Sequence, residues 1–189
     1  PAAPAANTDS VANGEWLTWG GDAGFQRYSP LDQINADNAK TLEVAWRWNA
    51  LPFSDRPDGN LKATPLYIDG VLYTPSGVNQ AVALDPETGA EIWRFNPDPA
   101  DIGGRAASVS SRALAYWTDG TARRLFHNTP DGRLISIDAA TGKADPAFGT
   151  NGYVLLKEQL RPDGQAAPFV GSSSPATVVG DVVIAQTVA

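Results

Sequence analysis

The stretch A-L-D-P-E-T-G-A-E-I-W, from Ala83 to Trp93, predicts a tight hairpin between two strands. Asp85 is placed to accept the backbone N–H groups of the residues that follow it, as in a type I turn. Gly89 has access to the left-handed conformation that closes such a loop with a bulge. Residues 80–84 and 90–95, on either side of the turn, are therefore expected to be strands.

A related string returns later in the chain. Residues 136–143 read S-I-D-A-A-T-G-K, so the D-x-x-T-G core of Asp85 recurs 53 residues later at Asp138. Residues 64–72 have an echo in residues 174–182, and both carry a proline that is followed five residues later by a turn glycine. Several strands in a repeat of roughly 40 to 50 residues are typical of the blades of a β-propeller.

Composition limits the possible partners and sites. The chain has 189 residues, of which 42% are hydrophobic, and its 14 basic and 21 acidic residues give a formal net charge of −7. This acidic balance disfavours nucleic acid as a partner. There is no cysteine for a disulfide or thiolate metal site, and the single histidine, His127, excludes a histidine cluster. We interpret His127 as a structural residue of a strand.

The sequence also bears on location and chemistry. A start at Pro1 without an initiator methionine is expected of a mature exported chain that has lost its signal peptide, or of a trimmed chain. Hydrolase and nucleotide-binding signatures such as G-x-S-x-G, H-E-x-x-H and G-x-G-x-x-G are absent from the sequence. The sequence therefore gives no support to those two classes.

The motif A-x-D-x-x-T-G-x-x-x-W resembles the tryptophan-docking motif of the dehydrogenases that depend on pyrroloquinoline quinone (PQQ). Residues 16–34 are similar to the N-terminal signature of that family, and residues 111–117 resemble the stretch that opens its second blade. The resemblance runs from about Gly14 to the last residue. It implies an all-β fold, namely part of an eight-bladed β-propeller with about two to three blades in this chain. The residues that fulfil the docking motif are Ala83, Asp85, Thr88, Gly89 and Trp93.

The resemblance divides the chain into five parts. The parts are a flexible leader (1–13), an N-terminal arm with a ring-closing strand at Leu42–Trp48 (14–61), the first full blade with its connection (62–111), the second blade (112–171) and the truncated start of a third (172–189). The second blade departs from the family pattern, because Pro146 occupies the position of its docking tryptophan, four residues after Gly142.

We also predict individual elements. A short helical turn is expected at Asn35–Thr41, with Asn35 or Asp37 as its cap. Eight strands are expected near Thr64–Ile68, Val71–Pro75, Gln80–Leu84, Glu91–Phe95, Arg112–Trp117, Arg123–Thr129, Leu134–Asp138 and Tyr153–Leu156.

PQQ is a planar tricarboxylate, so its protein must offer cations or hydrogen-bond donors to its edge. By position, Arg112 matches the family's arginine that contacts a PQQ carboxylate. Ser172 and Thr187 match hydroxyl residues near the cofactor, and Ala189 falls in a small-residue turn that lets the backbone approach the quinone. Lys62 occupies a position that is acidic in several relatives but suits a carboxylate equally well. The alternative for all five is an ordinary structural role in the inner strands.

The resemblance places neither catalytic nor metal-binding residues in this chain. The catalytic aspartate, the calcium or lanthanide ligands and the tryptophan under the cofactor belong to later blades of the family. Some relatives carry two adjacent cysteines that form a ring disulfide over the cofactor. The matching positions are Ala106 and Ala107, so that disulfide is excluded here.

The implied function is that of the N-terminal part of a periplasmic quinoprotein dehydrogenase. Such an enzyme oxidises an alcohol or sugar hydroxyl by hydride transfer to PQQ, with Ca²⁺ or a lanthanide held by ligands outside this chain. Its partners are the remainder of the same propeller, a small alcohol or sugar substrate, and a cytochrome or quinone electron acceptor. This chain alone is expected to be inactive. Two alternatives stay open: a non-catalytic propeller with PQQ-like repeats that serves as a protein-binding scaffold, and an inactive relative.

Overall fold

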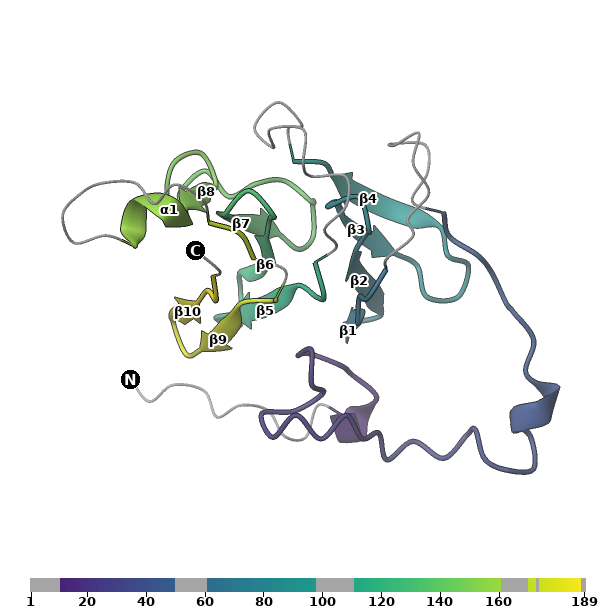
Figure 1. Cartoon of the computed structure of the whole chain (residues 1–189). Coiled ribbons are helices and arrows are strands. Elements are labelled where there is room, and N and C mark those ends of the chain that lie inside the picture. The colour runs from purple at the N-terminus through teal and green to yellow at the C-terminus, as the bar shows by residue number, and fades with distance from the viewer. Residues whose placement is uncertain (1–10, 50–60, 98–110, 161–169, 173, 188–189) are drawn as a thin grey trace.

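The computed structural model describes residues 11–49, 61–97, 111–160, 170–172 and 174–187, and its regular structure is almost entirely β (Figure 1). Two four-stranded antiparallel sheets and one antiparallel pair follow one another along the chain. The first sheet consists of β1 (Leu66–Ile68), β2 (Val71–Pro75), β3 (Ala81–Leu84) and β4 (Glu91–Phe95), and the second of β5 (Ala115–Thr118), β6 (Arg123–Asn128), β7 (Arg133–Asp138) and β8 (Tyr153–Leu155). The pair is β9 (Thr177–Val179) and β10 (Val182–Ile184).

The strand predictions are confirmed. In both four-stranded sheets the spatial order equals the chain order, so each sheet is a simple antiparallel meander. Strands β2 and β4 have the predicted bounds, and the other six begin or end within a few residues of them. The echo between residues 64–72 and 174–182 is confirmed as well, because β1–β2 and β9–β10 are both tight hairpins.

The hairpin turn of the first sheet has the predicted chemistry. One carboxylate oxygen of Asp85 accepts the backbone N–H of Thr88 at 2.8 Å and its hydroxyl at 2.9 Å. These bonds, the backbone one first, lower the pKa of Asp85. Gly89 has a φ of 70°, and the strand after it is shifted in register by a bulge. Asp138 and Gly142 repeat this geometry in the second sheet, so the sequence repeat is a structural repeat.

The indole of Trp93 joins the two sheets. It projects from the outermost strand of the first sheet, β4, and its Nε1–H donates to the carbonyl of Ala139 at 2.9 Å. A Cβ atom placed on Gly142 would lie 2.5 Å from the same indole, so the ring lies directly on the turn. The tryptophan of the docking motif therefore packs between its own sheet and the next.

Trp46 makes the same contact with the first sheet. Its Nε1–H donates to the carbonyl of Pro86 at 2.9 Å, and a Cβ on Gly89 would lie 2.5 Å from its ring. The segment Leu42–Trp48 has no strand pairing in the described part of the chain. The ring-closing strand expected there stays a prediction, because the resemblance places its partner strands outside this chain. A strand needs a neighbour to satisfy its backbone groups, and no described strand lies beside this one.

Two expectations need correction, namely the extent of the helical turn and the residue that caps it. The helical turn predicted at Asn35–Thr41 is a single 3₁₀ turn, Ala39–Thr41, and its N-cap is Asn38 rather than Asn35 or Asp37. The amide oxygen of Asn38 accepts the backbone N–H of Asn35 at 2.8 Å, so it stabilises the loop before the turn instead of the turn itself. A short helix, α1 (Leu156–Gln159), follows β8 and had no sequence signal; a second 3₁₀ turn covers Val11–Asn13.

The hydrophobic core runs across the boundary between the two sheets. Trp93 and Trp16 pack against the buried residues of this core, and two backbone hydrogen bonds between Trp16 and Tyr67 fix the N-terminal arm. As a separate point, none of the described helices is long and apolar enough to cross a membrane. The buried members of the cluster are Leu66, Ile68, Tyr73, Ala81 and Ala83 from the first sheet, and Leu114, Leu125, Ile135, Ile137 and Ala139 from the second.

Polar contacts cross the same boundary. The Tyr73 hydroxyl donates to the carbonyl of Ala139 at 3.3 Å, and His127, which is fully buried, has its Nε2 3.1 Å from the carbonyl of Asn79. A carbonyl only accepts, so Nε2 carries the proton of a neutral ring. Burial is the main cause that lowers the pKa of His127, to about 4. The interpretation of His127 as a structural residue agrees with this buried contact between sheets.

We expect Gly142→Ala to lower the free energy of unfolding of the intact protein by about 3 kcal/mol. Strain at a φ of 70° contributes about 1 to 2 kcal/mol, and the new methyl group collides with Trp93. Gly70→Ala is the matched control, because its φ is 79° and nothing lies within 4 Å of a Cβ there. Urea unfolding of both variants measures the difference. Equal losses would contradict the docking contact.

The buried His127 makes stability depend on pH. Its folded pKa of about 4 lies below the ordinary 6.5, so between these values the unfolded state binds the extra proton. We therefore expect its contribution to be complete above pH 6.5 and to fall by about 3 kcal/mol as the pH decreases to 4. Urea unfolding of the intact protein and of His127→Gln from pH 7.5 to 4 measures it. A constant difference between the two proteins would contradict the assignment.

Candidate functional site

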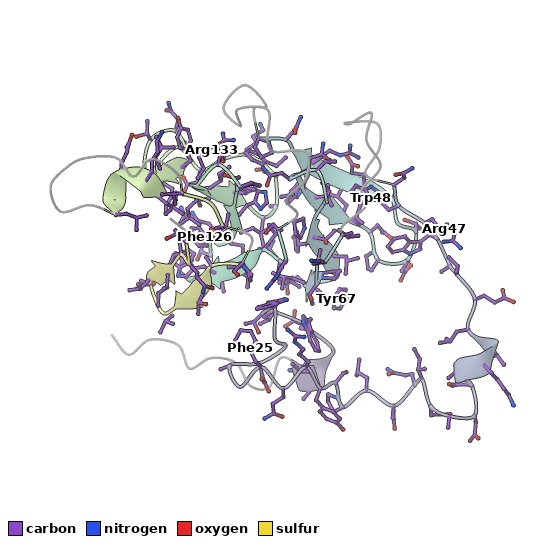
Figure 2. The ribbon with its side chains drawn as sticks, in the orientation of Figure 1. Phe25, Arg47, Trp48, Tyr67, Phe126 and Arg133 are labelled. Atoms are coloured by element: carbon purple, nitrogen blue, oxygen red, sulfur yellow. The ribbon has the colours of Figure 1, made fainter. Side chains whose placement is uncertain are left out.

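Four of the five predicted site residues lie among the described residues, at one end of the sheets, which we call the entry end. It is the end where β1, β5 and β9 begin. Because neighbouring strands are antiparallel, the β2–β3 turn (residues 76–79) and the β6–β7 turn (residues 129–132) lie at this end too. The docking turns after β3 and β7 lie at the opposite end. Figure 2 labels Arg133, at the start of β7 next to the β6–β7 turn, and Phe126, within β6 of the same sheet.

Arg112 and Lys62 lie on neighbouring segments of the entry end. The carbonyl of Arg112 accepts the backbone N–H of Thr64 at 2.8 Å, which joins the segment before β5 to the segment before β1. Lys62 is two residues before Thr64. Both cationic side chains are exposed, and neither forms an ion pair with any residue that the structure describes. Two exposed cationic residues therefore lie on neighbouring, hydrogen-bonded segments.

Ser172 is buried at the entry end, on the segment that leads to β9. Its hydroxyl oxygen accepts the Nδ2–H of Asn128 at 3.2 Å, and its own hydrogen is directed at the carbonyl of Ser174, also at 3.2 Å. The same Nδ2 group donates to the carbonyl of Ser174 at 2.9 Å. Ser172 is therefore held by the second sheet through Asn128.

Of the other two predicted residues, the structure describes Thr187 but not Ala189. Thr187 is half-buried and follows the last residue of β10 by three positions. Since β10 runs antiparallel to β9, Thr187 lies toward the entry end. Ala189 lies outside the described residues, as do Ala106 and Ala107. The entry end therefore includes Lys62, Arg112, Ser172 and Thr187 among the described residues.

The β2–β3 turn is built from buried polar groups that the sequence reasoning missed. The Ser76 hydroxyl accepts the backbone N–H of Gln80 at 3.2 Å, and Asn79 has a φ of 66°. Both side-chain polar atoms of Asn79 and the Nε2 of Gln80 are buried without a hydrogen-bond partner among the described residues. Such groups are costly unless a further partner meets them. The signal in the sequence was a polar S-G-V-N-Q run between two apolar strands.

The β6–β7 turn carries a buried ion pair. The Nε of Arg133 lies 2.8 Å from a carboxylate oxygen of Asp131, and only 5% of the Arg133 side chain is exposed. The turn also receives the chain that returns from α1, because a Cβ on Gly132 would lie 2.6 Å from the carbonyl of Val170. The pair holds the turn in one geometry, since breaking it would leave the buried Arg133 charge away from water.

The arrangement suits binding rather than proton transfer. It offers two exposed cations, a serine hydroxyl and buried amide groups, which are donors for an anionic, oxygen-rich ligand. Within the described part of the chain, no group of three or more His, Cys, Asp and Glu residues comes together as a metal site would require. The chemistry of the entry end is therefore that of a surface which holds the edge of a ligand.

Comparisons with known proteins identify the family that the chain resembles. Residues 16–189 match the family described as "Glucose/ethanol/alcohol dehydrogenase, beta-propeller domain", whose model is that of the PQQ proteins. The chain is 36% identical over 175 residues to the quinohemoprotein alcohol dehydrogenase ADH IIB of Pseudomonas putida, covering 92% of this chain and 22% of that protein. It is 39% identical over 174 residues to the dehydrogenase subunit of the quinone alcohol dehydrogenase of Gluconobacter oxydans, covering 90% and 21%.

Solved structures give the same result. The quinohemoprotein alcohol dehydrogenase of Comamonas testosteroni superposes with a TM-score of 0.73 at 28% identity, covering 95% of this chain and 24% of that one. The chain spans about a fifth to a quarter of the length of these relatives. The match to this structure shows that the two meanders and the hairpin are propeller blades, as predicted. The chain therefore belongs to the glucose, ethanol and alcohol dehydrogenase β-propeller family of PQQ proteins.

Proposed function

We propose that this chain supplies cofactor-edge contacts of a periplasmic quinoprotein dehydrogenase, which oxidises an alcohol or sugar hydroxyl by hydride transfer to PQQ. The observation that carries the proposal is the gathering of Arg112, Lys62 and Ser172 at one end of three successive blades. The names of the relatives support the chemistry, since they are alcohol dehydrogenases of quinohemoprotein and quinone type.

The residues present fit such a cofactor. Arg112 offers a planar fork of N–H groups to one carboxylate, and Lys62 offers a compact charge to another. Their exposed side chains need not break an ion pair within the described residues to do so. The hydroxyls of Ser172 and Thr187 add neutral donors. Ala189 remains a prediction for the close approach of the backbone.

When bound, PQQ supplies a two-electron acceptor for the hydride of the substrate. The residues of this chain hold and orient the cofactor edge by charge-assisted hydrogen bonds, and none of them is assigned a proton transfer. The same proposal includes Ca²⁺ or a lanthanide held by other residues of the protein. It also includes a cytochrome or quinone that receives the electrons, and export to the periplasm.

We expect Arg112→Ala to weaken PQQ binding to the intact apoprotein by roughly tenfold to a hundredfold. The loss corresponds to about 1.5 to 3 kcal/mol for one charge-assisted hydrogen-bonding group. PQQ would be titrated by its absorbance in the presence of Ca²⁺, and dye-linked oxidation of a primary alcohol would follow in the same samples. Lys62→Ala should have a smaller effect, because an ammonium group binds a carboxylate with less geometric fit.

Lys143→Ala is the matched control for this series. Lys143 is an exposed cation in the docking turn at the opposite end of the second blade, so its removal changes the net charge without touching the entry end. If Arg112→Ala and Lys143→Ala weakened PQQ binding equally, the effect would be that of net charge, and the assignment of Arg112 would be wrong. If the intact protein bound no PQQ at all, the scaffold or inactive alternative would replace the enzyme.

A further inference from the structure

We propose that Asn128 is a positioning residue for the segment that carries Ser172. The proposal rests on the proposed function, because it names how one part of that cofactor site is held. Asn128 is the last residue of β6, and its side chain is completely buried. Its single amide nitrogen donates to the Ser172 hydroxyl at 3.2 Å and to the Ser174 carbonyl at 2.9 Å.

The orientation of this amide follows from its partners. The carbonyl of Ser174 only accepts, so the group that faces it must be the Nδ2–H₂ end of Asn128. That end also donates to the oxygen of Ser172, which leaves the hydroxyl hydrogen of Ser172 as the mobile group. In the absence of a ligand this hydrogen is directed at Ser174. It can turn to an anionic oxygen without any loss of the bond from Asn128.

The strand geometry explains why one blade can hold both neighbours. Successive side chains of a β-strand point to opposite faces, so His127 and Asn128 face different blades. His127 contacts the carbonyl of Asn79 in the first blade, and Asn128 contacts Ser172 and Ser174 in the third. The end of β6 therefore sets the distance between the β2–β3 turn and the segment before β9.

Asn128 acts through Ser172 rather than on the ligand. It is fully buried, and its nitrogen is already engaged by two acceptors. Ser172, which is 6% exposed, and the exposed Arg112 are the groups that a ligand at the entry end would meet. A residue that works in this way should alter the affinity for PQQ while the protein remains folded, and its effect should not add to that of Ser172.

The test is the affinity of the intact apoprotein for PQQ in the presence of Ca²⁺. We expect Asn128→Ala to raise the dissociation constant at least tenfold, and Asn128→Asp, which keeps the volume but loses the N–H donors, to do the same. The double variant, which adds Ser172→Ala, should have a dissociation constant for PQQ no higher than that of the worse-binding single variant. The reason is that both changes remove one shared contact. If the Asn128→Ala variant does not fold, the Asn128→Asp variant tests the proposal in its place.

Tyr73→Phe is the matched structural control. It removes another buried hydrogen bond between blades, to Ala139 at the docking turn, far from the entry end. We expect it to lower the melting temperature while leaving the PQQ dissociation constant within twofold. The positioning role would be overturned if the Asn128 variants lost only thermal stability, as expected of Tyr73→Phe. It would also be overturned if the losses of PQQ affinity from the Asn128 and Ser172 changes multiplied in the double variant. Wild-type protein that binds no PQQ would overturn the proposed function itself.

Discussion

The structure depends on an indole ring that lies flat on a glycine of the next blade. Trp93 spans from β4 to the turn around Gly142, and Trp46 spans to the turn around Gly89. The contact works only because both glycines have positive φ angles and no side chain. An indole there combines apolar burial with one hydrogen bond to a turn carbonyl, so it fixes both the separation and the rotation of neighbouring blades.

This constraint is placed at one end of the blades, and the candidate site is at the other. The docking turns follow β3 and β7, whereas Arg112 and Ser172 precede β5 and β9. Because the strands between the two ends are short and hydrogen-bonded in register, a blade moves as a unit. The docking end can therefore hold the scaffold while the entry end differs in the side chains that it offers to a ligand. Functional groups commonly lie at the loops of a rigid scaffold in this way.

In the described part of the chain, polar contacts hold the entry end. Three buried side chains make these contacts: Arg133 pairs with Asp131, His127 bonds to Asn79, and the amide of Asn128 bonds to Ser172. Buried polar contacts of this kind tolerate little change in geometry, because each lost partner leaves a group that water cannot reach. A ligand-binding end benefits from such rigidity, since its donors are ordered before the ligand arrives.

The sequence by itself determined the turns and the strand order. The D-x-x-T-G pattern forms a hairpin through bonds that span only three to five residues, so the turn geometry at Asp85 and Asp138 follows from the local sequence. Tertiary structure decided the rest. It docked Trp46 on the turn around Gly89, 40 residues or more along the chain, and it brought Asn128 to Ser172 from 44 residues away. Such contacts depend on how neighbouring blades pack and on their register, and no local pattern records either.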